Sequence, residues 1–210
     1  TWLAERDQAW RDAVEVVAMD GFTGFKTATT EELPDAVAVM DPFHVVRLAG
    51  DALDRCRRRI QQDLHGHRGR AGDPLYSARR TLHTGTSLLT DKQKTRLDAL
   101  FADDAHVQVE VTWAAYQQMI TAYREPDPAR SRGLMQQLIT SLSSGVPAAL
   151  VELRTLGRTL KQRAADVLAY FDRPGTSNGP TEAINGRLEH LRGSALGFRN
   201  LTNYIARSLL

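Results

Sequence analysis

The sequence predicts a predominantly helical protein with a small α/β unit near its N-terminal end. Only two segments are typical of buried strands, namely VEVVAM (residues 14–19) and DAVAVM (residues 35–40). Each is a short, Val-rich apolar run of the kind that parallel sheets bury on both faces. From Pro42 onward, apolar residues recur at helical spacing. The strands are therefore confined to about the first 40 residues.

The two strands and the segment between them form a predicted βαβ unit. Residues 21–34 have the length of a compact helix and end at Pro34, which favours a right-handed crossover between parallel strands. Residues 2–13 are typical of a further helix before the first strand. Because a two-stranded sheet buries little and exposes its edges, we expect further strands upstream of Thr1 in the complete protein.

The remainder of the chain is predicted to be helical. One long amphipathic helix covers residues 43–64, with its other face basic, and a loop rich in Gly and Arg follows it. Its apolar positions are Val45, Leu48, Ala52, Cys56, Ile60 and Leu64. Further helices are expected at about residues 75–83, 90–102, 105–123, 129–143, 148–171, 180–191 and 201–210.

Composition excludes several classes of protein. Hydrophobic residues make up 42% of the 210 positions, enough for a substantial core, and no apolar run approaches the roughly 20 residues that span a bilayer. A single cysteine, Cys56, excludes an internal disulfide framework and favours the reducing cytoplasm. Since the net charge is only +2, any case for binding nucleic acid depends on where the basic residues lie.

Acidic residues follow both predicted strands. Asp20 and Asp41 each come directly after an apolar run, where open α/β folds place ligands. Glu182 lies near the start of a predicted helix, after a proline suited to the first turn. Each acid could instead cap or stabilise the N-terminus of a helix. The residues alone leave both interpretations open.

Three blocks, taken in order, resemble the catalytic region of DDE transposases of the ISL-three family of bacterial insertion sequences. The blocks are VVAMDGFTGF, LPDAVAVMDPFHVVRLA and TSNGPTEAINGRLEHLRGSALGFRN. Within them, the D-x-F-H-V pattern that begins at Asp41 and the N-G-x-T-E-x-x-N pattern around Glu182 are specific in combination. The resemblance runs from about residue 14 to residue 210.

The resemblance implies an RNase H-like core, incomplete at its N-terminus, that carries a large all-helical insertion. Residues 1–47 would belong to the core, residues 48–175 to the insertion, and residues 176–210 to helices of the core that bear the catalytic Glu. The implied activity is metal-dependent cleavage and transfer of DNA strands during transposition. Because the family places the first catalytic Asp upstream of Thr1, we expect this chain to be inactive by itself.

The resemblance also assigns a metal site. Asp20 would be the second acid of the DDE triad and Glu182 the third, and together they would bind Mg²⁺ or Mn²⁺. Two divalent ions about 4 Å apart activate the attacking oxygen and neutralise the leaving one in such reactions, and carboxylates are their preferred ligands. Asp41 and His44 resemble an acidic-x-x-His element that supports the site. Asp41 as the second metal ligand, and His44 as a direct participant, remain alternatives.

Double-stranded DNA, as transposon ends and target, is the implied partner. The basic helix face contributes Arg55, Arg57, Arg58 and Arg59, and the C-terminal region contributes Arg187, Arg192 and Arg199. Arginines in such clusters neutralise backbone phosphates, although a solvated helix face would show the same pattern. The resemblance further implies a homo-oligomer on DNA, a nucleoid-associated location in the cytoplasm and no membrane association.

Two other classes of protein remain open on the sequence alone. An RNase H-like nuclease or resolvase would use the same carboxylates, and a strand-transfer assay would distinguish it. A non-enzymatic helical DNA-binding protein would explain the arginines without Asp20 or Glu182. The sequence does not identify the terminal repeats that the complete protein would recognise.

Overall fold

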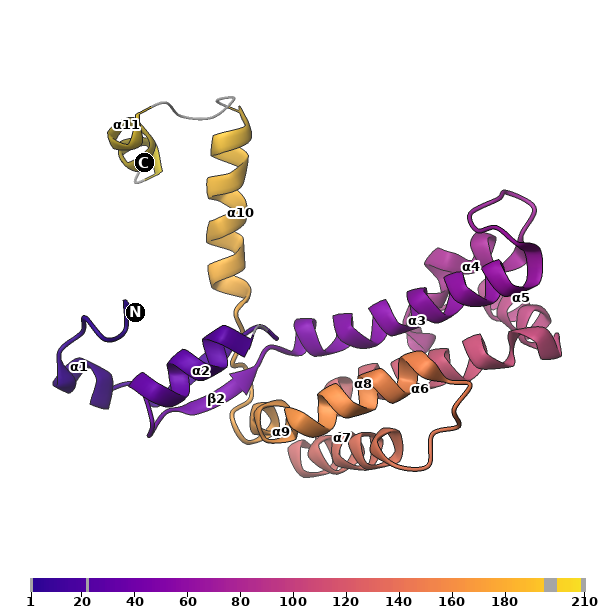
Figure 1. The fold of residues 1–210 in the computed structure, drawn as a ribbon, viewed down its shortest axis with the longest axis horizontal. Helices are drawn as coiled ribbons and strands as arrows, with labels where there is room; N and C mark the ends of the chain where they lie inside the picture. The colour runs from indigo at the N-terminus through magenta and orange to yellow at the C-terminus, as the bar shows by residue number, and fades with distance from the viewer. Residues whose placement is uncertain (1, 22, 195–199, 209–210) are drawn as a thin grey trace.

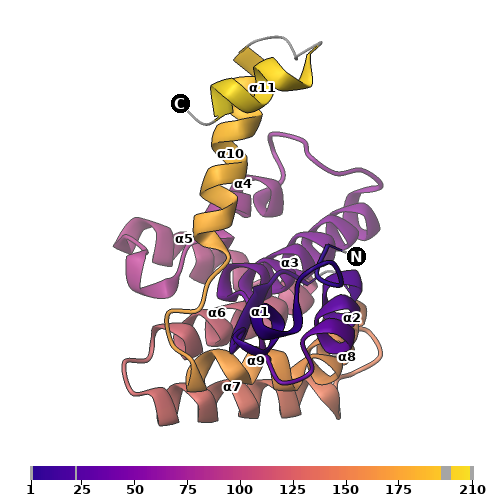
Figure 2. The ribbon, with the colours of Figure 1, turned by 90° about the vertical axis from the view of Figure 1, so that its left-hand side faces the viewer.

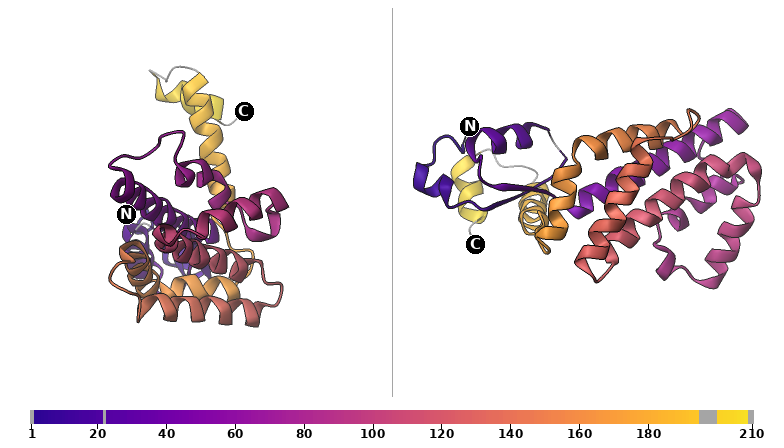
Figure 3. Two further views of the ribbon diagram at one scale, coloured as in Figure 1. Left: turned by 90° about the vertical axis from the view of Figure 1, so that its right-hand side faces the viewer. Right: turned by 90° about the horizontal axis from the view of Figure 1, so that it is seen from below.

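The computed structural model describes residues 2–21, 23–194 and 200–208. The described chain is predominantly helical, as predicted, with one two-stranded sheet at one end and a helical bundle at the other (Figure 1; Figure 3). None of its helices is long and apolar enough to cross a membrane.

The sheet is the predicted parallel pair. Strand β1 (Val16–Met19) pairs with β2 (Val37–Met40) in a register that places Val16 opposite Val37 and Met19 opposite Met40. Helix α2 (Thr23–Glu32) makes the crossover between them, and α1 (Gln8–Asp12) precedes β1. The predicted βαβ unit is therefore present, although an RNase H-like core remains a prediction.

The long predicted helix is a single element, α3 (Pro42–His65), which runs from the end of β2 to the far end of the bundle (Figure 1). Asp41 caps its N-terminus and Pro42 occupies its first turn, both favourable there. It ends at Gly66, whose φ of 65° is a left-handed conformation that glycine adopts without strain. Leu64, the last residue of the predicted apolar face, is exposed and therefore does not belong to that face.

Most of the other helices also match the prediction, and no strand interrupts residues 64–172, all of which the structure describes. They are α4 (Pro74–Leu82), η1 (Thr86–Leu88), α5 (Asp91–Phe101), η2 (Asp104–His106), α6 (Val107–Arg124), α7 (Pro128–Ser143), α8 (Val151–Gln162), α9 (Ala164–Asp172), α10 (Gly179–Ser194) and α11 (Leu201–Ser208).

The single helix predicted over residues 148–171 is wrong, because two helices, α8 and α9, meet at Arg163. The Arg163 side chain bonds Asp166 Oδ2 at 2.7 Å, the Gly21 carbonyl at 3.4 Å and Met19 Sδ at 3.5 Å. The turn directs α9 against β2. Neither glycine nor proline marks this break in the sequence.

One hydrophobic core joins the bundle to the sheet. Val45, Ala52 and Ile60 of α3 pack with apolar residues of α6, α7 and α8, and Met40 at the end of β2 belongs to the same cluster. The predicted domain boundary at residues 47 and 48 falls inside α3, and α9 covers the sheet although it lies within the predicted insertion. These domain bounds therefore stay a prediction.

Helices α10 and α11 stand away from the rest of the molecule. Both lie beyond the bundle in two perpendicular views, with α11 at the far end of α10 (Figure 1; Figure 2). Large apolar side chains on them are exposed, namely Ile184, Leu201 and Ile205. The position of α10 consequently depends on a few contacts at its base.

Candidate active site

The two strand-end acids lie side by side at one edge of the sheet. Met19 pairs with Met40, and the Asp41 amide continues the ladder by donating to the Met19 carbonyl at 2.9 Å. Because neighbouring strands lie about 4.8 Å apart, the backbones of Asp20 and Asp41 approach to roughly that distance. The parallel register thus gathers both acids at the carboxyl edge of the sheet.

Asp41 is buried and forms a junction between two segments. Its Oδ1 accepts a hydrogen bond from the Phe43 amide at 2.8 Å, which caps α3. Its Oδ2 accepts from the Ser177 hydroxyl and from the Asn178 amide, each at 2.7 Å. One oxygen therefore binds the start of α3 and the other binds the segment that leads into α10, so Asp41 connects the two.

These contacts also set the charge state of Asp41. Burial by itself would raise the pKa of this carboxyl, but hydrogen bonds from Ser177, Asn178, Phe43 and His44 outweigh it and lower the pKa below its usual value. Asp41 is consequently ionised at neutral pH, and its negative charge is stabilised by donors rather than by a cation.

Glu182 reaches the same region from the other end of the chain. It lies in the first turn of α10, and its Oε1 is 2.7 Å from His44 Nε2 in the first turn of α3. The side chain of His44 is 17% exposed and that of Glu182 is 44% exposed, so the histidine is partly buried and the glutamate is exposed. The predicted acidic-x-x-His element therefore contacts the segment around Glu182 through both Asp41 and His44.

A divalent metal fits the chemistry of this edge. Asp20 and Glu182 offer carboxylate oxygens, and Mg²⁺ in proteins uses one or two carboxylates together with water and phosphate oxygens. Across the described residues, no group of three or more His, Cys, Asp or Glu is arranged to hold a metal ion. A role for Asp20 and Glu182 as metal ligands therefore stays a prediction.

Basic residues that the sequence analysis missed lie behind the edge. Asp166 of α9 is buried and bonds both Lys26 Nζ of α2, at 2.5 Å, and Arg163. Arg163 in turn reaches the Gly21 carbonyl just after Asp20. These contacts fix the turn after β1, but no local sequence pattern connects residues 140 positions apart.

The predicted DNA-binding arginines of α3 fall into two groups. Arg57 is 5% exposed and bonds Gln61 and Asp54, while Arg59 makes two 2.9 Å bonds to Glu152 of α8. Arg55 and Arg58, by contrast, are exposed. Arg57 and Arg59 are thus held by contacts within the protein, and Arg58 also bonds Asp54. A role of these arginines in DNA contact stays a prediction.

Two of the three C-terminal arginines lie on α10. Arg187 is exposed, and Arg192 is exposed and paired with Glu189 at 3.1 Å. Arg199, the third predicted DNA contact, lies outside the described residues. Arg187 and Arg192 therefore share with Glu182 a helix that projects from the body.

A family model of transposases, DDE transposases of the ISL3 type, matches residues 1–208 of the chain. The chain belongs to this family. The resemblance identified from the three sequence blocks is thus confirmed, and the juxtaposition of His44 and Glu182 links two of those blocks in space.

Curated relatives of this transposase chain are similar over most of its length. The transposases for insertion sequence element IS1557 from two strains of Mycobacterium tuberculosis are 27% identical over 214 residues, covering 92% of this chain and 47% of their own length. The chain thus spans about half the length of the curated relatives it matches. No solved structure matches it.

Proposed function

We propose that this chain is part of the catalytic region of a transposase that cuts and joins DNA strands with Mg²⁺ or Mn²⁺, and that its α/β unit belongs to an RNase H-like core. One observation carries the proposal. The His44–Glu182 hydrogen bond brings a glutamate from the end of the chain to the sheet edge where Asp20 and Asp41 lie side by side. The proposed substrate is transposon DNA, and membership of the transposase family supports this part of the proposal.

In this proposal Asp20 and Glu182 hold the metal, and Asp41 and His44 position them. Asp41 is better suited to positioning than to binding metal, because both of its oxygens already accept hydrogen bonds from within the protein. When bound, the metal activates the attacking oxygen and neutralises charge on the leaving one. The proposal further requires a third acid, which the complete protein would supply.

The direct test uses the complete protein and two glutamates of α10. Glu182→Gln should abolish cleavage of a labelled transposon end and weaken binding of Mn²⁺ measured by calorimetry, since the amide removes the negative charge that holds the ion. Glu189→Gln is the matched control, because Glu189 is exposed on the same helix and paired only with Arg192 among the described ion pairs. Equal cleavage by the Glu182→Gln variant and the parent would refute the assignment.

The same assay separates the other proposed properties. A joined product, in addition to a cut one, distinguishes a transposase from an RNase H-like nuclease. The 210-residue chain alone should bind DNA and show little or no cleavage, because it supplies only two of three acids. Sedimentation of the complete protein on a transposon end tests the proposed homo-oligomer.

A further inference from the structure

A basic cavity of about 350 Å³ lies near the C-terminal end of α3. Its lining comes from one helix and from the loop that follows it. The lining residues are Arg55, Arg58, Arg59, Gln62, Asp63 and Arg68. Four of the six are arginines, which no role in the proposed metal site explains.

The cavity has an uncompensated positive charge. Arg59 is neutralised by its two bonds to Glu152, and Arg58 shares Asp54 with Arg57 while its side chain stays 48% exposed. Neither Arg55 nor Arg68 forms an ion pair among the described residues, although the charge of Arg55 helps to lower the pKa of Glu152. The single acid of the lining, Asp63, is 3.6 Å from Arg59 and leaves the balance positive.

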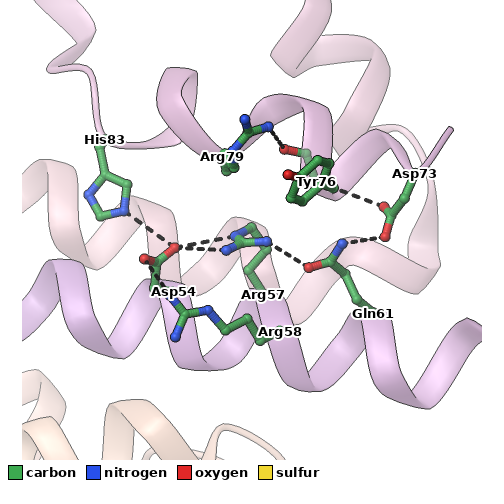
Figure 4. A network of polar contacts seen from close by, with 8 residues as sticks. All are labelled: Asp54, Arg57, Arg58, Gln61, Asp73, Tyr76, Arg79 and His83. Atoms are coloured by element: carbon green, nitrogen blue, oxygen red, sulfur yellow. Dashed lines mark hydrogen bonds and ion pairs between the residues drawn. The ribbon is translucent and has the colours of Figure 1, made fainter. Parts of the chain in front are cut away.

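A buried polar network fixes the loop that carries Arg68. Gln61 is fully buried, accepts from Arg57 at 2.6 Å and donates to Asp73, which caps α4 (Figure 4). Arg57 is held in turn by Asp54, which also contacts His83 (Figure 4). Because Asp73 ends the loop, this network anchors the loop that carries Arg68 at its C-terminal end.

The cavity and the candidate active site share one face of α3. A helix turns about 100° per residue, so Arg55, Arg58 and Gln62 lie within about 40° of His44 around the axis. The structure agrees, because these three side chains are exposed whereas the core-facing positions of α3 are buried. Moreover, α10 rises from one end of α3, and the loop with α4 lies at the other (Figure 1).

We infer that this cavity binds a backbone phosphate of a DNA duplex that extends along α3 from the sheet edge. The inference rests on the proposed function. At about 1.5 Å per residue, the centre of the cavity lies about 22 Å from His44, which equals six or seven base pairs at about 3.4 Å each. The contact neutralises phosphate and reads no base, so it positions the duplex without selecting its sequence.

The first test measures binding by the 210-residue chain to a fluorescent 24-base-pair DNA duplex at several salt concentrations. Replacing Arg55 and Arg68 with Ala should weaken binding several-fold and lower the slope of log affinity against log salt by about one unit, because each neutralised phosphate contributes about 0.9. Asp63→Asn should strengthen binding. Neither change touches the buried network.

The control removes the same charge elsewhere. Arg130 and Arg132 of α7 are exposed, and α7 lies on the side of the bundle away from the loop (Figure 1; Figure 2). Replacing both with Ala should leave the slope unchanged. Equal losses from the two double variants, or a loss confined to an RNA duplex of the same length, would overturn the inference.

The second test locates the phosphate in the complete protein on a transposon end. Single neutral methylphosphonate linkages are placed at successive positions from the cleaved bond, and affinity is measured without added metal. A linkage six or seven base pairs away should weaken the parent but not the Arg55→Ala, Arg68→Ala variant. Loss at another position only would contradict the inference, whereas loss of cleavage in the Glu182→Gln variant bears on the proposed function alone.

Discussion

His44 and Glu182, which are 138 positions apart, are joined by a hydrogen bond of 2.7 Å between Nε2 and Oε1. This bond connects the first turn of α3 to the first turn of α10. Because α10 otherwise stands away from the body, the bond and the two contacts of Asp41 with residues 177 and 178 determine where Glu182 lies.

Removing the histidine should therefore loosen the base of α10. His44→Ala deletes a single hydrogen bond worth about 1 kcal/mol, so the amides of residues 181–186 should exchange hydrogen roughly fivefold faster. His44→Gln retains a donor and should recover part of the protection. Unchanged exchange in the His44→Ala variant would mean that the bond does not hold α10.

Asp41 should contribute more to stability than an ordinary capping residue. Asp41→Ala removes the cap of α3 and leaves Ser177 and Asn178 without their acceptor, for a cost of about 2–4 kcal/mol. Asp127→Ala is the matched control, since Asp127 caps α7 through the Arg130 amide and also precedes a proline. It should cost about 1 kcal/mol. Equal changes in urea-unfolding free energy would contradict the junction described for Asp41.

The ion pair between Arg59 and Glu152 should make stability depend on acidity. Hydrogen bonding to Arg59 lowers the pKa of Glu152, despite burial that acts in the other direction. A lowered pKa stabilises the folded state above the unfolded value of about 4.3, and this contribution is lost as the pH falls through the folded value. Glu152→Gln should therefore cost about 1.5–3 kcal/mol at pH 7 and less at pH 3.

The control for this comparison is Glu31→Gln, which alters an exposed carboxyl on α2. It should change the unfolding free energy by less than about 0.5 kcal/mol. A Glu152→Gln penalty that is equal at the two pH values would show that the Arg59 pair is not the origin of the effect.

The buried network around Gln61 should control access to the basic loop. Gln61→Leu leaves Arg57 and Asp73 buried without their shared partner, at a cost of about 2–4 kcal/mol. Trypsin should then cut after Arg68 or Arg70 faster than in the parent. The neighbouring Gln62→Leu alters an exposed side chain and should leave the cleavage rate unchanged.

The contact between α7 and α8 should tolerate no side chain at Gly157. A Cβ there would lie 1.9 Å from the Leu142 carbonyl oxygen, so Gly157→Ala must separate the two helices. We expect a loss of several kcal/mol, seen as a lower thermal midpoint. Gly133→Ala in α7 meets no atom within 4 Å apart from its chain neighbours and the backbone of its own helix, and it should stabilise the protein by about 0.5–1 kcal/mol.

Helices and strands were predicted well where the spacing of apolar residues agreed with the residues that begin or end such elements. The two strands and α3 follow from runs of apolar residues, and capping by Asp41 was one of the two roles that the sequence left open for this residue. The break at Arg163 could not be predicted, because its cause is a set of contacts with residues more than 140 positions away.

Among the arginines of α3, helical spacing could predict the position of one residue but not that of another. Arg57 lies four residues after Leu53 and three before Ile60, so its place on the buried face could have been inferred from helical spacing. The pairing of Arg59 with Glu152 depends on how α8, which carries a residue 93 positions later, packs against α3. No local signal in the sequence carries that information.

The hydrogen bonds that Asp41 accepts from Ser177 and Asn178 join two points of the chain that are far apart in sequence. The chain leaves the sheet edge at residue 41 and returns to it 136 positions later, within hydrogen-bonding distance of its point of departure. A change in the length of a connection among the helices between α3 and α9 therefore need not displace the acids at this edge. The cost of closing so long a loop rises only with the logarithm of its length.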